Sequence, residues 1–271
     1  MKHILMTGAA GGLGKAALVE LAARGYRIFA LDIAIENLMG CSSATIIPIQ
    51  CDITDAHSLL CAKEKVQGLT DRLDAIINVA GIFAMHSLSE VDPTEVEHLI
   101  AVNCMGSVRV NQTFLDLLVP GQGRIINCSS EVGRFAAIPF NGPYTISKKA
   151  LEAYNDTLRR ELGFLGYRII KIQGGSFRTA MHARTEEQFA HFKETTKLYG
   201  PTLKLLEPIL KWELRHVHDP RHFTNALIKA LEAKRPKSAY RVKNSPLLKL
   251  LTMFGQRFTD LIFLVLGRMA R

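Results

Sequence analysis

Short apolar runs rich in Ile and Val alternate along the chain with stretches of helical periodicity. Continuous apolar runs are typical of strands in a parallel sheet that is buried on both faces. Stretches with helical periodicity, such as Lys15 to Arg24 and Lys149 to Gly163, lie between these runs. The alternation predicts right-handed βαβ units in one doubly wound α/β domain. Its strands are expected at 4–6, 27–31, 46–49, 75–77, 124–127, 169–172 and 237–242.

Two helical segments carry clearer signals. Asp92-Pro93-Thr94-Glu95 offers an N-cap, a proline at the first helical position and an acid at the third, so a helix is expected from there through Asn103 towards Phe114. From Pro246 to Arg271, apolar residues recur at steps of three, four and one, which predicts a single amphipathic helix. The chain is therefore divided into one domain, residues 1–245, and a helical extension, residues 246–271.

The composition indicates the cellular compartment and gives the sign of the net charge. The 271 residues are 48% apolar, enough for the core of one large α/β domain, and the N-terminus lacks the apolar core of a signal peptide, which favours a cytoplasmic protein. Five cysteines without a C-x-x-C pair indicate reduced thiols, and no histidine has metal-ligand spacing, so no metal is expected. The net charge is +9, and residues 200–271 hold all of the excess, with 14 Lys and Arg against 5 Asp and Glu.

A glycine loop separates the first strand from the first helix. Gly8, Gly12 and Gly14 follow the spacing G-x-x-x-G-x-G, with Leu13 inside the loop. Glycines here let the backbone approach a pyrophosphate, and the helix N-terminus supplies free N–H groups. Asp32 ends the second strand 18 residues after Gly14, where an acid binds ribose hydroxyls and repels a 2′-phosphate. No arginine stands beside Asp32, so NAD(H) is expected rather than NADP(H).

A tyrosine and a lysine form the candidate acid–base pair. Tyr144 and Lys148 are four residues apart and share one face of a predicted helix. A nearby ammonium favours the phenolate, so Lys148 is expected to lower the pKa of Tyr144. Ser130 ends the strand before this helix, where its hydroxyl can donate to a substrate oxygen.

The order of these motifs, from residue 4 to about 180, resembles the short-chain dehydrogenase/reductase family, which has a Rossmann fold. The resemblance implies that Tyr144 transfers the proton, Ser130 holds the substrate oxygen, Lys148 binds the nicotinamide ribose, and Asn103 anchors a water in the proton relay. It also implies a nicotinamide cofactor. Beside the glycine loop and Asp32, the expected cofactor residues are Ile33, Asp52, Ile53, Asn78, Ala80, Gly81, Tyr144, Lys148, Gly175, Phe177 and Thr179.

Two positions depart from the family pattern. Ser130 lies 14 residues before Tyr144, where 13 is usual, and Glu131 occupies the usual offset. A one-residue insertion within 134–143 explains this difference, and Ser130 is kept as the catalytic serine. Gly174 stands where the family has proline, so the loop over the nicotinamide is expected to be more mobile, with Thr179 still able to bind the carboxamide.

The substrate is expected to be sizeable and apolar. Residues 180–218 occupy the place of the family's substrate lid and are rich in aromatic and aliphatic side chains, although these could equally be core. The chain resembles the hydroxysteroid and retinol dehydrogenase-like branch. Two alternatives stay open: a reductase of 3-oxoacyl thioesters, which the basic C-terminus would suit, and a non-catalytic NAD-binding sensor.

The basic C-terminal end suggests an anionic partner. No nucleic-acid-binding motif is present, so nucleic acid is not expected. The segment 246–271 is too interrupted to span a bilayer. Three placements remain for it: packing on its own domain or on a second subunit of a homo-oligomer, covering the substrate entrance, or lying in an anionic membrane surface.

Overall fold

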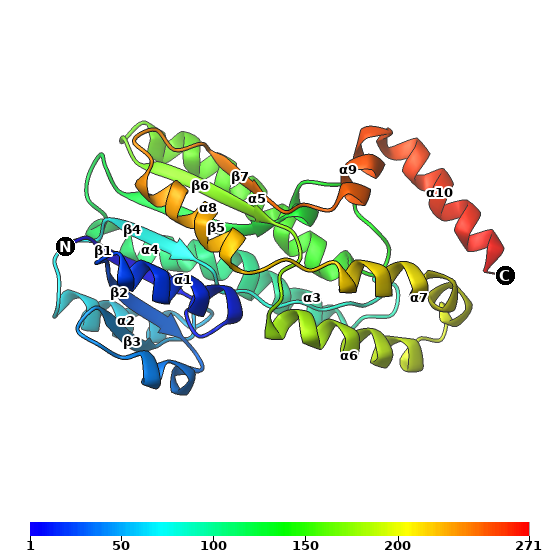
Figure 1. The fold of residues 1–271 in the computed structure, drawn as a ribbon, viewed down its shortest axis with the longest axis horizontal. Coiled ribbons are helices and arrows are strands. Elements are labelled where there is room, and N and C mark those ends of the chain that lie inside the picture. Colours follow the sequence, from blue (N-terminus) through cyan, green and yellow to red (C-terminus); the bar gives the residue numbers. More distant parts are fainter. Residues whose placement is uncertain (271) are drawn as a thin grey trace.

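The computed structural model describes residues 1–270 and has one seven-stranded sheet as its centre (Figure 1). The strands run in the order β3-β2-β1-β4-β5-β6-β7, and every neighbouring pair is parallel. All seven expected strands are present: β1 (His3–Thr7), β2 (Arg27–Asp32), β3 (Ile46–Gln50), β4 (Ala75–Asn78), β5 (Arg124–Ser130), β6 (Arg168–Gly174) and β7 (Ala239–Val242). The predicted α/β fold class is therefore confirmed.

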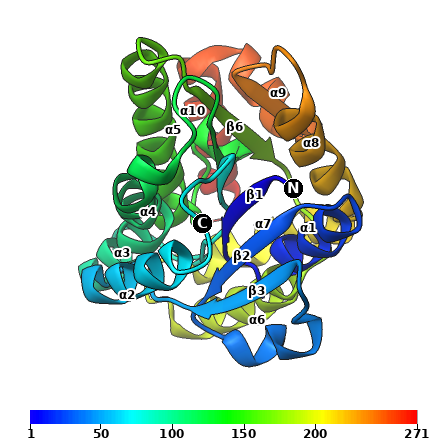
Figure 2. The ribbon, with the colours of Figure 1, turned by 90° about the vertical axis from the view of Figure 1, so that its left-hand side faces the viewer.

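Helices cover both faces of this sheet (Figures 1 and 2). One apolar core is shared with α1 (Gly12–Ala23) and α8 (Arg221–Glu232). The other is shared with α2 (Ala56–Gln67), α4 (Ser107–Phe114) and α5 (Gly142–Gly163). The strand order reverses between β1 and β4, and a crevice for ligands forms at the carboxyl ends of the strands at such a point.

The helix predicted from Pro93 to Phe114 contains a π-helical turn. Asp92 caps its start as expected, because its carboxylate accepts from Thr94 N at 2.9 Å. The segment divides into α3 (Pro93–Ile100), a π-helical stretch (Ala101–Gly106) and α4. Short π segments are rare and often lie at functional sites. Here the π turn carries Asn103, and the pattern of apolar positions alone does not indicate it.

Two further helices form the predicted lid region, α6 (Ala180–Thr195) and α7 (Gly200–Arg215). They lie beside one another beyond the carboxyl ends of the strands (Figure 1). Phe189, Phe192 and Leu203 are buried between them, and the partly buried Phe140 from the loop before α5 packs against this cluster. Much of the apolar character of 180–218 therefore serves the packing of the two helices.

The C-terminal extension is not the single helix that the sequence predicted. It consists of α9 (Pro246–Met253) and α10 (Gly255–Met269), which meet at an angle of 115°. Gly255 has φ +77°, a left-handed conformation that ends a helix readily at glycine, so the chain turns there although the apolar pattern continues. Among the described residues, no single helix is long and apolar enough to cross a membrane, whereas this bent pair passes that test together.

Candidate active site

The loop between β1 and α1 packs so closely that its glycine positions leave no room for side chains. Gly8 has φ +65°, and a Cβ on it would lie 2.5 Å from Ala80 N. A Cβ on Gly14 would lie 2.0 Å from Gly8 O. The N-cap of α1 is Gly11, which has no side chain to bind the N–H groups of the first turn. These donors suit a pyrophosphate, so the loop fits the expected dinucleotide.

Asp32, at the end of β2, faces this loop. Its carboxylate accepts from Ala10 N at 2.9 Å and from Ala34 N at 3.0 Å. A carboxylate offers about four acceptor positions, so these two bonds fix Asp32 and leave acceptors for ribose hydroxyls. The neighbouring Ile33 is 63% exposed and brings no positive charge.

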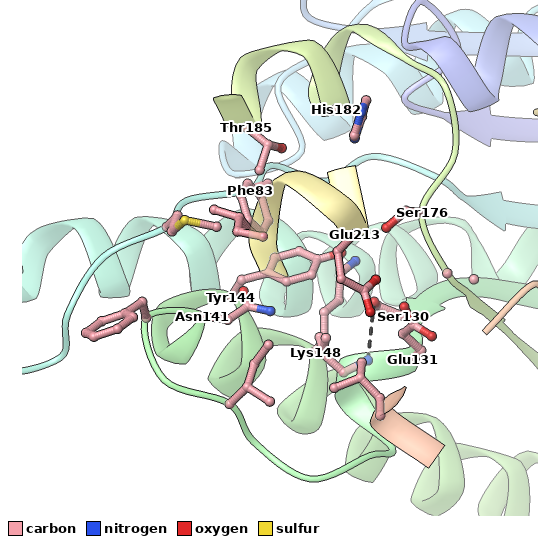
Figure 3. A pocket seen from close by; sticks show the side chains of 18 of the residues that line it. Phe83, Ser130, Glu131, Asn141, Tyr144, Lys148, Ser176, His182, Thr185 and Glu213 are labelled. Atoms are coloured by element: carbon pink, nitrogen blue, oxygen red, sulfur yellow. Dashed lines mark hydrogen bonds between the residues drawn. The ribbon is translucent and has the colours of Figure 1, made fainter. Parts of the chain in front are cut away.

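Ser130, Tyr144 and Lys148 lie near one another in the wall of a pocket (Figure 3). The last residue of β5 is Ser130, and its hydroxyl interacts with the phenol of Tyr144 on α5. Lys148 Nζ lies 5.7 Å from the centre of the Tyr144 ring and donates to Cys128 O at 3.2 Å. Gly81 completes the group, because a Cβ there would lie 3.5 Å from Lys148 Nζ.

Burial dominates the electrostatics of this group. It raises the pKa of Tyr144 to about 12, although the hydrogen bond with Ser130 opposes the rise. Burial likewise lowers the pKa of Lys148 to about 8. The sequence predicted a lowered tyrosine pKa; the protein alone shows the opposite direction, since the loss of water outweighs any help from an ammonium that is bonded to Cys128 O. The phenol is thus held in its protonated, proton-donating form.

Asn103 lies next to Gly81, and its side-chain amide makes three hydrogen bonds within the protein. Its Oδ1 accepts from Ile82 N at 2.8 Å, and its Nδ2 donates to Ile82 O at 2.9 Å and to Ser147 Oγ at 2.9 Å. These bonds fix the chain that follows Gly81 to the helix that carries Tyr144. The role of Asn103 in binding a water stays a prediction, whereas this supporting role is visible in the contacts.

Asn78, which was expected at the cofactor, belongs to a buried amide network. Its Nδ2 donates to Asn111 Oδ1 and to Asn127 Oδ1, both at 2.8 Å. Asn127 in turn donates to Asn155 Oδ1 at 2.9 Å, and Asn111 donates to the phenol of Tyr154 at 3.1 Å. The side chain of Asn78 therefore joins β4 to β5 and α4 under the site.

The other expected cofactor residues flank the crevice on two sides. The Asp52 carboxylate accepts from Thr54 N at 2.8 Å, and Ile53 is buried against the π-helical turn at Gly106. On the opposite side, Gly175, Phe177 and Thr179 line the pocket together with Leu13. A Cβ on Gly12 would lie 2.7 Å from the side chain of Thr179, so the loop after β6 closes against the glycine loop.

The pocket itself has a volume of about 440 Å³ and mostly apolar walls. Lid helices, the loop before α5 and the C-terminal pair all contribute to it. The side chains that α9 and α10 supply are Leu247, Leu248, Leu251, Ile262, Phe263 and Leu266. The C-terminal pair therefore lines this pocket, whereas its contact with a membrane or a second subunit stays a prediction.

Sequence reasoning assigned no role to two acids in this pocket, Glu131 and Glu213 (Figure 3). Burial raises the pKa of Glu131 to about 7, and the charge of Glu213 adds to the rise, while a bond from Ser245 N and the charge of Lys249 oppose it. Glu131 had a signal in the sequence, since an acid directly after a buried strand occupies the offset usual for the catalytic serine. Glu213 had none, because its position depends on the path of α7.

The comparison with protein families settles the affiliation. Residues 2–190 match the family described as short chain dehydrogenase. The chain belongs to the short-chain dehydrogenase family. It is therefore an oxidoreductase that acts on CH–OH groups with a nicotinamide cofactor. Among curated short-chain dehydrogenases, it is similar to human retinol dehydrogenase 16, with 29% identity over 88% of this chain and 80% of the relative. It is also similar to human 17-beta-hydroxysteroid dehydrogenase type 6, with 34% identity over 72% of this chain and 66% of the relative.

One further relative and one solved structure are described with NADPH or NADP. A relative from Schizosaccharomyces pombe is an NADPH-dependent 1-acyldihydroxyacetone phosphate reductase, 30% identical over 68% of this chain and 62% of the relative. A short-chain dehydrogenase structure from Streptomyces avermitilis superposes with a TM-score of 0.75 at 20% identity, covering 98% of this chain and 95% of that one. Another, from Burkholderia cenocepacia J2315 in complex with NADP, has a TM-score of 0.71 at 21% identity, with 96% and 97% covered. Both share the fold.

Proposed function

We propose that this short-chain dehydrogenase interconverts a secondary alcohol and a ketone, or an alcohol and an aldehyde, on a sizeable apolar molecule such as a steroid or retinoid. The observation that carries the proposal is that Ser130 and Tyr144 lie together in a pocket of about 440 Å³ whose walls are mostly apolar. The names of the retinol and hydroxysteroid dehydrogenases among its relatives support this substrate class.

The side chains have separate roles in this proposal. Tyr144 gives its proton to the ketone oxygen during reduction and takes it back during oxidation. Ser130 donates a hydrogen bond to the same oxygen, where negative charge develops. Lys148 binds the ribose of the cofactor, and Asn103 anchors a water in the proton relay. The nicotinamide supplies or accepts the hydride, which is chemistry that no side chain provides.

We further propose that the cofactor is NAD(H). Gly8, Gly12 and Gly14 hold the pyrophosphate, and Asp32 accepts from the adenosine ribose. A 2′-phosphate would stand against this carboxylate, with the exposed Ile33 beside it and no guanidinium. One relative is described as NADPH-dependent, so the relatives do not decide between the two cofactors. The proposed preference for NAD(H) therefore depends on Asp32.

Turnover of apolar alcohols tests the proposal. A panel of secondary alcohols, steroids and retinol is incubated with the protein and NAD⁺, and NADH is followed by its absorbance. Oxidation of apolar members, with slower oxidation of short polar ones, is expected. Exclusive reduction of acetoacetyl-CoA in a parallel assay with NADH would favour the thioester reductase instead. Binding of NADH without any turnover would favour a sensor.

The C-terminal pair supports a further part of the proposal, a peripheral contact with anionic membranes. While one side of α10 lines the pocket, its other side exposes Leu261 (54%), Leu264 (60%) and Val265 (46%). Met253 and Phe254 at the bend are 81% and 56% exposed. The basic excess of residues 200–271 complements anionic headgroups, and an apolar substrate would then reach the pocket from the bilayer. A homo-oligomer stays a prediction.

Vesicle binding tests this contact. The protein is expected to sediment with vesicles that contain phosphatidylserine, and added salt is expected to weaken the binding. Substituting both Leu261→Glu and Leu264→Glu should abolish it. The matched control is Leu60→Glu on α2, a leucine that is 55% exposed far along the chain from the pair. If the wild-type protein does not bind these vesicles at low salt, the exposed side of α10 is instead a contact between subunits.

A further inference from the structure

One serine connects three parts of the pocket wall. Ser245 directly precedes α9, and its backbone N–H donates to Glu131 Oε2. Its hydroxyl donates to Glu213 Oε1 at 3.1 Å and also accepts from Leu248 N at 3.4 Å, which caps α9. We call Ser245, Glu131 and Glu213 together the Ser245 junction.

Each member of the Ser245 junction comes from a different part of the fold. Glu131 follows Ser130 at the end of β5, Glu213 lies in the last turns of α7, and Ser245 begins the C-terminal pair. The carboxyl groups of Glu131 and Glu213 lie on the same side of the pocket, next to Ser130 (Figure 3). The junction therefore connects the catalytic strand end, the lid and the C-terminal helices.

The helices after Ser245 form one part of the pocket wall. Leu248 is buried against Val132 and Phe135, with Tyr144 packed beside them. Farther along α9, Ala136 N donates to Thr252 Oγ1 at 2.9 Å. The bend to α10 is held within the pair, because Thr259 Oγ1 donates to Leu251 O at 3.0 Å. The start of α9 therefore sets where the whole pair stands over the pocket.

Burial of the Glu131 carboxyl is unfavourable by itself. Its pKa of about 7 reflects that cost, and the neighbouring charge of Glu213 increases it. An apolar side chain would fill the same space without such a penalty. The carboxyl nevertheless supplies something that an apolar side chain lacks, an acceptor for the backbone N–H of the half-buried Ser245.

We propose that Glu131 is a positioning residue, which through Ser245 holds the C-terminal helix pair over Ser130 and Tyr144 so that an apolar substrate is enclosed. Glu213 holds the same serine from the lid side. Neither carboxyl takes part in the proton transfer. The inference deepens the proposed function and rests on it for the kinetic readout, whereas its structural readout requires no turnover.

The test combines kinetics with hydrogen exchange in the full-length protein. Glu131→Ala removes the acceptor, while Glu131→Gln keeps an oxygen that can accept from Ser245 N. For Glu131→Ala, KM for an apolar alcohol is expected to rise about tenfold or more, with kcat changed much less. Amide exchange within 246–269 is expected to become faster. Glu131→Gln should restore both values towards wild type, and Glu64→Ala, at an exposed acid on α2, should change neither.

Other outcomes separate the possibilities. Unchanged KM and unchanged exchange in Glu131→Ala would overturn the inference. A fall in kcat alone, with exchange as in wild type, would also overturn it, because Glu131 would then act on the proton transfer. If Glu131→Ala does not fold, Glu131→Leu takes its place, because it fills the space without an acceptor for Ser245 N and should give the same rise in KM and the same faster exchange. If wild type oxidises no alcohol, the proposed function fails, and exchange alone still decides the junction.

Discussion

Replacing Glu131 with glutamine isolates the stability cost of one buried carboxyl. The pKa of this group is about 7 in the folded protein and 4.5 in its ordinary state. As pH rises above 4.5, the unfolded chain releases this proton while the folded protein keeps it, so the free energy of unfolding falls until pH reaches about 7. One pKa unit corresponds to about 1.4 kcal/mol, which makes the full difference about 3 kcal/mol. Glutamine does not titrate, so the variant lacks this fall.

Urea unfolding at pH 5 and at pH 8 measures the effect. From pH 5 to pH 8, the free energy of unfolding of Glu131→Gln is expected to rise by about 2–3 kcal/mol relative to that of wild type. This is slightly less than the full difference, because part of the fall in the wild-type free energy lies below pH 5. Other titrating groups are the same in both proteins and cancel. Glu64→Gln, at an exposed acid, serves as the control and should show no such gain. Parallel pH profiles for wild type and Glu131→Gln would refute the assigned burial cost.

Three further outcomes are expected. Asp32→Ala should reduce the preference for NAD⁺ over NADP⁺, mainly through weaker NAD⁺ binding, as kcat/KM with both cofactors will show. Gly8→Ala should abolish NADH binding, measured by fluorescence titration, because its φ is +65° and the new Cβ would meet Ala80 N at 2.5 Å. Asn127→Ala should lower the free energy of unfolding by about 1–3 kcal/mol, because it removes one of the two acceptors of the buried Asn78 amide and the donor to the buried Asn155 Oδ1.

The sheet was predictable because each strand signal is local. A buried parallel strand is a short run of apolar residues, and a glycine loop or an N-cap such as Asp92 marks where a helix begins. The break at Gly255 was not predicted, since the apolar stripe continues through it at a helical spacing. Only the left-handed backbone at this glycine shows that the stripe belongs to two helices.

The candidate site was likewise predictable from the sequence only in part. Ser130, Tyr144, Lys148 and Asn103 were predicted together because their order along the chain resembles that of the short-chain dehydrogenase family. The pKa of Tyr144 could not be read from its spacing to Lys148, because it depends on burial by residues far away in the chain. For the same reason, the roles of Asn78 and Glu131 became visible only through their partners in other elements.

The central claim is that Tyr144 donates the proton in an alcohol–ketone interconversion. It is tested most directly by comparing Tyr144→Phe with wild type for both NADH binding and turnover of an apolar alcohol. The phenyl ring keeps the packing beside Leu248, so NADH should bind with little change. Turnover should fall by about 10²–10⁴-fold or more, because the positioned acid is gone. A phenylalanine variant that turns over at nearly the wild-type rate would contradict the account.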